Sequence, residues 1–131
     1  MNTLLLTLFI SMLLPFLAKA PLVVAMNRQP GGYDNRHPRA QQKRLTGFGE
    51  RATAAHYNSF EALLIYAAAV LAVFVNGQID TLTLTLGWIF IGSRVAYLVL
   101  YWVNLSSLRS LVWLLGIVSA FVMAGRAVWG G

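Results

Sequence analysis

The stretch RATAAHYNSFEALLIYAAAVLAVFV (residues 51–75) joins a polar-marked first half to an unbroken apolar second half. A helix that crosses the hydrocarbon core of a bilayer needs about 20 mostly apolar residues, and this stretch supplies them. Ionisable side chains inside such a span cost about 2.5–3.5 kcal/mol each on insertion scales, so a protein that keeps them generally uses them. The stretch therefore predicts a membrane-spanning helix that carries a functional polar face.

Three further stretches, 3–26, 81–103 and 107–129, have the length and apolar content of membrane spans. The 131-residue chain is 58% hydrophobic and only 11% charged, which is more apolar surface than one soluble core of this size can bury. The later connections are short, and short connections make consecutive helices antiparallel neighbours. We therefore predict an all-α integral membrane protein, an up-down bundle of four transmembrane helices forming a single domain over residues 1–131.

Basic residues gather in the long first connection, residues 27–50. They are Arg28, Arg36, Arg39, Lys43 and Arg44. The positive-inside rule places this connection and the turn near 104–106 in the cytoplasm, with both termini on the other side, although Arg126 opposes the assignment. The net charge of +6 then reflects orientation and contact with anionic lipid rather than nucleic-acid binding. The first span resembles a signal peptide at residues 18–20, but no basic residue precedes it, so we interpret it as a retained helix.

The absence of cysteine excludes disulfides, thiolate metal sites and a cysteine nucleophile. The two histidines lie on different segments without a ligand cluster, so no metal site is expected. Any thiol chemistry must use a thiol that a ligand provides.

The polar residues of two predicted spans fall on single helical faces. They are Arg51, Asn58 and Glu61 on the second span and Arg94, Tyr97 and Tyr101 on the third. At a rise of about 1.5 Å per residue, Glu61 and Arg94 both lie about 13 Å below the cytoplasmic boundary. Arg109, in the first turn of the fourth span, lies near the rim. We predict one polar cavity that opens to the cytoplasm and has a Glu61–Arg94 pair as its floor.

Three arginines and one carboxylate favour an anionic ligand, because a guanidinium binds carboxylates in bidentate fashion. A small zwitterionic peptide with two carboxylates fits this chemistry, and so does a lipid headgroup. A structural reading stays open as well. Glu61 and Arg94 can form an ion pair that only joins two helices, and Arg51 and Arg109 can reach lipid headgroups.

The stretch Arg51-Ala52-Thr53-Ala54-Ala55-His56-Tyr57-Asn58-Ser59-Phe60-Glu61 resembles the second-helix signature of the membrane-associated proteins in eicosanoid and glutathione metabolism, the MAPEG family. The resemblance extends to Arg94-x-x-Tyr97-x-x-x-Tyr101 and to Arg109, and it covers essentially the whole chain. The loop sequence Tyr33-Asp34-Asn35-Arg36-His37-Pro38-Arg39-Ala40 is similar to that of a bacterial branch, which implies the bacterial inner membrane.

The resemblance implies a homotrimer that binds glutathione as a cosubstrate between subunits near the cytoplasmic face. It assigns glutathione binding to Arg51, Asn58, Glu61, Arg94, Tyr97 and Tyr101. Arg109 matches the arginine that stabilises the glutathione thiolate in leukotriene-forming members. The implied enzyme is a microsomal-type glutathione transferase or peroxidase acting on an apolar electrophile or lipid hydroperoxide from the bilayer.

The chain also departs from the family pattern. Ala54 stands where many members carry a second arginine, and no proline follows Glu61. The connection before Arg109 is one residue longer than in the leukotriene-forming members. These departures leave open a non-catalytic protein of the same fold that binds an anionic lipid or another anion, and a purely structural trimer.

Overall fold

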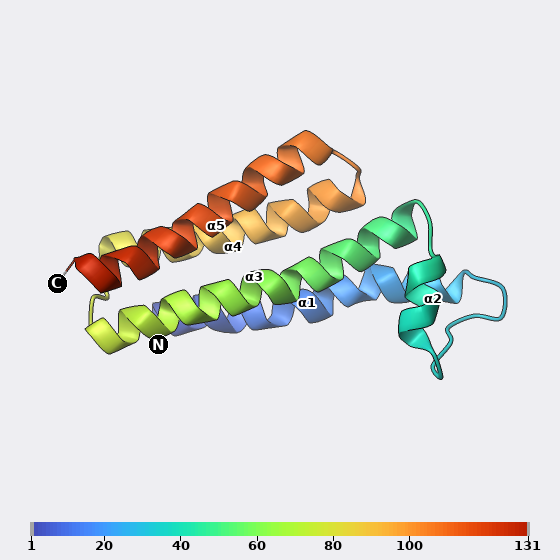
Figure 1. Ribbon diagram of the computed structural model, residues 1–131, viewed down its shortest axis with the longest axis horizontal. Helices are drawn as coiled ribbons and strands as arrows, with labels where there is room; N and C mark the ends of the chain where they lie inside the picture. The colour runs from blue at the N-terminus through green and yellow to red at the C-terminus, as the bar shows by residue number, and fades with distance from the viewer. Residues whose placement is uncertain (1, 131) are drawn as a thin grey trace.

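The computed structural model describes residues 2–130, which form five helices. They are α1 (Thr3–Asn27), α2 (Pro38–Arg44), α3 (Phe48–Asn76), α4 (Thr81–Trp102) and α5 (Ser106–Trp129). The long helices α1 and α3 lie side by side, and the α4–α5 hairpin packs along them (Figure 1). The start of α1 and the end of α5 lie at one end of the bundle, and α2 lies at the other. We call these the terminal end and the loop end.

Within residues 2–130, four helices are long and apolar enough to cross a membrane: α1, α3, α4 and α5. The predicted all-α membrane fold with four spanning helices is therefore confirmed. The helix α2 lies in the connection that the sequence indicated only as a loop. Pro38 occupies the first turn of α2, where the missing proline N–H costs no hydrogen bond. The next long helix, α3, begins three residues after the C-cap of α2, at Phe48.

The core of the terminal half is built around an aromatic stack. The rings of Tyr66 and Phe90 are parallel, with centroids 4.1 Å apart, and the Tyr66 hydroxyl shares a 2.6 Å hydrogen bond with the Thr7 hydroxyl. Gly87 makes this approach possible, because a Cβ atom there would lie 2.8 Å from the Tyr66 hydroxyl. Gly116 has the same role between α5 and the Ser93 hydroxyl of α4. Small residues thus let the helices approach closely, as is usual for helices packed within a membrane.

An ion pair joins α4 to α5 at the terminal end. Arg126 donates bidentate hydrogen bonds to Asp80, at 2.6 and 3.0 Å, and a third at 2.9 Å to the Thr83 hydroxyl. Asp80 also caps α4 by accepting a hydrogen bond from the Thr83 amide. The Arg126 guanidinium and the Thr83 amide together hold the pKa of the Asp80 carboxyl well below its usual range. Arg126, the basic residue that opposes the predicted orientation, therefore has its counter-charge within the same chain.

Two buried glutamines fix α2 at the loop end. The Gln41 side chain donates to the carbonyls of Met26 and Gly32 and accepts from the Asp34 amide. Gln42 accepts a 2.6 Å hydrogen bond from the Tyr57 hydroxyl of α3. These contacts hold the short helix against the ends of α1 and α3.

Candidate functional site

The candidate site is built on a contact between α3 and α4. Arg94 is only 2% exposed and donates a 2.8 Å hydrogen bond from Nη2 to the Asn58 side-chain oxygen. Its guanidinium also lies over the Tyr97 ring, 4.2 Å from the ring centroid. The second terminal nitrogen, Nη1, is buried without a hydrogen-bond partner. The site thus contains a buried cation that this chain satisfies only in part.

A second arginine repeats this stacking one helical turn closer to the loop end. The Arg109 guanidinium of α5 lies 4.3 Å from the centroid of the Tyr101 ring. Tyr101 in turn meets Tyr97 edge to face, with centroids 5.5 Å apart. Each cation–π contact is worth about 0.5–2 kcal/mol, depending on how far the pair is removed from water. The two tyrosines therefore hold two guanidinium groups along the same side of α4.

An open cavity of about 230 Å³ lies beside these stacks. Its walls are formed by Asn58, Tyr97, Tyr101, Arg109, Ser110 and Trp113. Residues with amide, phenol, hydroxyl and guanidinium groups thus line the cavity from three helices, and Trp113 adds an indole. Such a cavity can hold an anion by charge and hydrogen bonds, and it can place an apolar group against Trp113.

The structure brings together only part of the predicted set of residues. Asn58, Tyr97, Tyr101 and Arg109 line the cavity, and Arg94 contacts Asn58 and Tyr97 without being one of the lining residues. The Arg51 side chain, by contrast, makes a long 3.5 Å hydrogen bond to the Trp102 carbonyl and does not line the cavity.

The predicted Glu61–Arg94 floor is not formed, because no ion pair within residues 2–130 joins these two side chains. Arg94 contacts Asn58, almost one turn nearer the loop end, and Glu61 is exposed on the surface of the single chain. Glu61 and Arg94 were predicted to lie at the same depth from assumed helix boundaries. Depth counted along each helix separately does not fix the register of α3 against α4 to better than one turn.

Two lining residues, Ser110 and Trp113, were missed by the sequence analysis. They follow Arg109 by one and four positions on α5, so Trp113 shares the face of Arg109. That spacing was a usable signal, but a tryptophan near the end of a span is commonly interfacial, so its position alone did not indicate a ligand site. In the part of the chain that the structure describes, no group of three or more metal-ligating side chains is present.

The comparisons with known proteins agree with the architecture. The model of the MAPEG family matches residues 3–129, which is nearly the whole chain. No curated protein and no solved structure matches the chain. The span of the family match, together with the four membrane helices, shows that the chain belongs to the MAPEG family.

Proposed function

We propose that the protein is a glutathione-dependent transferase or peroxidase of the membrane. The observation that carries the proposal is Arg94, a buried guanidinium with one unpartnered nitrogen and no carboxylate within ion-pair distance in residues 2–130. A buried charge without a counter-charge costs several kcal/mol, and buried polar groups are normally satisfied. An anionic ligand at this position would remove that cost, and the carboxylates of glutathione supply the charge.

The residues around Arg94 suit the rest of such a ligand. Asn58 and Tyr97 offer neutral hydrogen bonds beside the buried guanidinium. We retain Arg51, Glu61 and Tyr101 as further candidate glutathione-binding residues, because the family includes glutathione-dependent enzymes. Glu61 is suited to the ammonium group of a zwitterionic peptide.

We assign Arg109 the role of stabilising the glutathione thiolate. A free thiol has a pKa near 8.5, and an adjacent guanidinium in a partly desolvated cavity favours the deprotonated form. In a conjugation, the thiolate sulfur forms a bond to carbon while the leaving group departs with its electron pair. In peroxide reduction, two glutathiones become the disulfide, and the hydroperoxide becomes an alcohol and water. The protein contributes position and charge stabilisation to either reaction.

We further propose that three copies assemble, with the loop end in the cytoplasm and both termini on the other side of a bacterial inner membrane. Glu61 supports the assembly, because it is exposed on the surface of a single chain within a helix long and apolar enough to span the membrane, about 20 Å along α3 from Phe48. A carboxylate at that depth is costly in lipid, and a neighbouring subunit would cover it. The cavity would then receive glutathione from the cytoplasm and the apolar substrate from the bilayer.

Isothermal titration of glutathione into the detergent-purified protein tests the proposal. We expect saturable binding that Arg94→Ala abolishes and that the matched control Arg44→Ala, on the exposed face of α2, retains. No binding to the folded wild-type protein at millimolar glutathione would overturn the proposal.

A second candidate is a non-catalytic member of the family that binds an anionic lipid or another anion in the same cavity. The arrangement at α3 favours it, because Ala54 supplies no charge and Arg51 contacts the Trp102 carbonyl instead of the cavity. Native mass spectrometry distinguishes the two candidates. The second one predicts a retained lipid that glutathione does not displace and that Arg94→Ala loses.

A further inference from the structure

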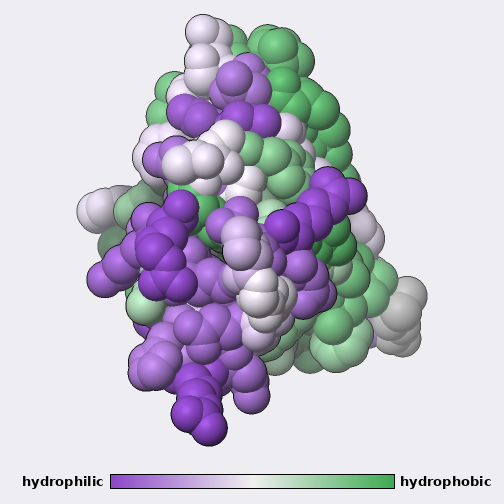
Figure 2. All heavy atoms as spheres, turned by 90° about the vertical axis from the view of Figure 1, so that its right-hand side faces the viewer, coloured by the Kyte–Doolittle hydropathy of each residue, from purple (hydrophilic) through white to green (hydrophobic). Residues whose placement is uncertain are grey.

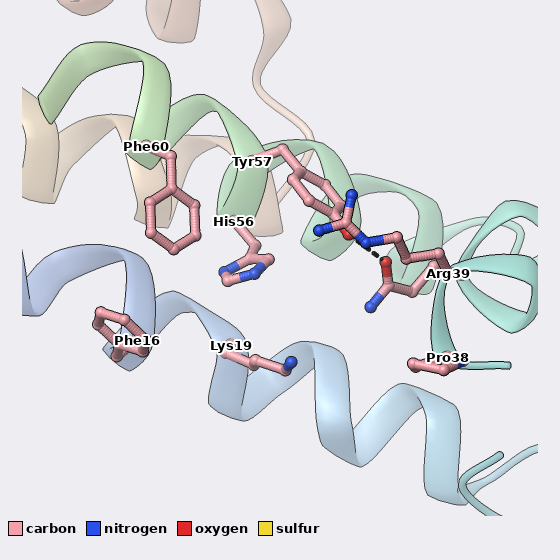
Figure 3. Close-up of a pocket in the computed structure, with 8 residues that line it drawn as sticks. Phe16, Lys19, Pro38, Arg39, His56, Tyr57 and Phe60 are labelled. Carbon is pink, nitrogen blue, oxygen red and sulfur yellow. Dashed lines mark hydrogen bonds between the residues drawn. The ribbon is translucent and has the colours of Figure 1, made fainter. Parts of the chain in front are cut away.

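A second and larger cavity, of about 490 Å³, lies between α1, α2 and α3 at the loop end. Its lining residues are Phe16, Lys19, Pro38, Arg39, Gln42, His56, Tyr57 and Phe60. None of them lines the cavity beside Arg109. Figure 3 shows the side chains from α1 and α3 facing one another across this space, with Arg39 reaching in from α2. We call it the α1–α2–α3 pocket.

The charged side chains of the pocket all have the same sign. Lys19 and Arg39 both line it, no acidic residue does, and no ion pair within residues 2–130 involves either cation. The Arg39 guanidinium lies over the Tyr57 ring at 5.7 Å, a contact that restrains the side chain and leaves its charge uncompensated. The pocket therefore favours a ligand with negative charge at the α2 side.

The other side of the pocket is aromatic. Phe16 and Phe60 meet edge to face, with ring centroids 5.7 Å apart, and Phe60 also contacts the His56 ring. Phe16 is 65% exposed and lies about 4.5 Å further from the loop end than Lys19 along α1. An anionic group near Lys19 would therefore lie nearer the loop end, and an apolar chain over Phe16 would lie further from it. The headgroup and the acyl chains of a lipid have the same order.

Hydrogen bonds hold the walls of the pocket in place without a ligand. His56 Nδ1 donates to the Pro15 carbonyl at 2.7 Å, because a carbonyl can only accept, and this bond joins α3 to α1. The Tyr57 hydroxyl donates to Gln42 and so joins α3 to α2. A pocket whose walls are already ordered loses less entropy when a ligand binds.

The position of the pocket indicates what can reach it. Seen from the loop end, hydrophilic residues gather on one part of the surface and hydrophobic residues on the rest (Figure 2). A ligand at this end can therefore meet both kinds of surface. Lys19 lies about 12 Å from the end of α1 at Asn27, a depth from which a lysine side chain reaches the headgroup region. The headgroup layer of the bilayer is therefore a natural source of ligands for this pocket.

We propose that the α1–α2–α3 pocket binds one anionic phospholipid, with its phosphate between Lys19 and Arg39 and the start of an acyl chain over Phe16 and Phe60. A free inorganic anion would use only the two cations and would leave the aromatic side without a function. The inference does not depend on glutathione chemistry, because it concerns other residues and another ligand.

The test is native mass spectrometry of the protein in neutral detergent, titrated separately with phosphatidylglycerol and phosphatidylcholine. We expect one phosphatidylglycerol per chain at concentrations where phosphatidylcholine does not bind. The Lys19→Gln/Arg39→Gln double variant should weaken that binding about tenfold or more. Lys43→Gln, which removes an exposed charge from α2 outside the pocket, is the matched control and should bind as wild type does.

Further measurements distinguish a phospholipid from a free inorganic anion as the ligand. Phe16→Ala should weaken binding of the phospholipid, and inorganic phosphate should not displace it. Equal binding of the two lipids, or equal losses in Lys43→Gln and the double variant, would overturn the proposal. Displacement by phosphate or by glutathione would also overturn it, because the pocket would then be a site for a small anion. If the double variant does not fold, the single variant Arg39→Gln replaces it, because Arg39 is exposed and its substitution should not disturb the fold. Its affinity for phosphatidylglycerol should then be lower than that of wild type.

Discussion

Arginine has opposite surroundings at the terminal end and in the middle of the bundle. Arg126 has a bidentate carboxylate partner in Asp80 and a third hydrogen bond to Thr83, so its charge is satisfied within the chain. Arg94 is more deeply buried, yet it has one amide oxygen, one aromatic ring and an unpartnered nitrogen. The first arrangement is complete and joins two helices, whereas the second needs another group. A buried cation without a counter-charge is therefore a stronger indication of a ligand site than charge alone, and this is the basis of the proposal for Arg94.

The largest expected effect separates these two arginines directly. Arg94→Ala should weaken glutathione binding about 100-fold or more, because a buried charge-assisted hydrogen bond is worth about 2–5 kcal/mol when one partner is truncated. Arg126→Ala should leave the affinity within about twofold, although it should lower the thermal midpoint. Titration calorimetry of both variants beside wild type measures the contrast. Equal losses of affinity would show that the effect comes from stability and not from a ligand contact.

Arg109 should affect the reaction more than the binding. We expect Arg109→Ala to lower kcat for conjugation about 10- to 100-fold while the affinity for glutathione changes little, since the guanidinium acts on the thiolate. Ultraviolet absorbance of the bound thiolate as a function of pH should show a higher thiol pKa in the variant. Wild-type turnover in Arg109→Ala would remove this arginine from the mechanism, and Arg109→Lys provides the control that keeps the charge.

The four membrane spans were predictable from the sequence, because each depends on a local property, namely about 20 consecutive apolar residues. Most of the cavity lining was also predicted, since Asn58, Tyr97, Tyr101 and Arg109 have fixed spacings on their own helices. The contact between Arg94 and Asn58 was not, because the relative shift of two packed helices depends on side-chain interlocking far from either residue. The α1–α2–α3 pocket was missed because it needs α2, whose position depends on the contacts of Gln41 and Gln42.

Glu61 provides a smaller effect that tests the structural alternative. If Glu61 only stabilises contacts between subunits, Glu61→Gln should dissociate the assembly while Asn58→Ala does not. If it contacts glutathione, Glu61→Gln should lower the affinity several-fold in an intact assembly. Native mass spectrometry gives the oligomeric state, and titration of the same sample gives the affinity. A dissociated variant whose subunits still bind glutathione normally would contradict the proposed role of Glu61 in the site.

The smallest effect belongs to the completed ion pair. Asp80→Asn should lower the thermal midpoint by a few degrees at pH 7, because exposed ion pairs contribute little and the Thr83 amide keeps an oxygen acceptor. The folded-state pKa of Asp80 is lowered, so its contribution is fully present above the ordinary pKa near 3.9 and is lost as the pH falls below about 4. The midpoints of wild type and variant, measured by circular dichroism, should therefore converge in acid. A gap that stays constant down to pH 2 would mean that the carboxylate charge is not what joins α4 to α5. Arg126 and Arg94 would then differ in how deeply they are buried, and not in whether a charged partner stabilises them.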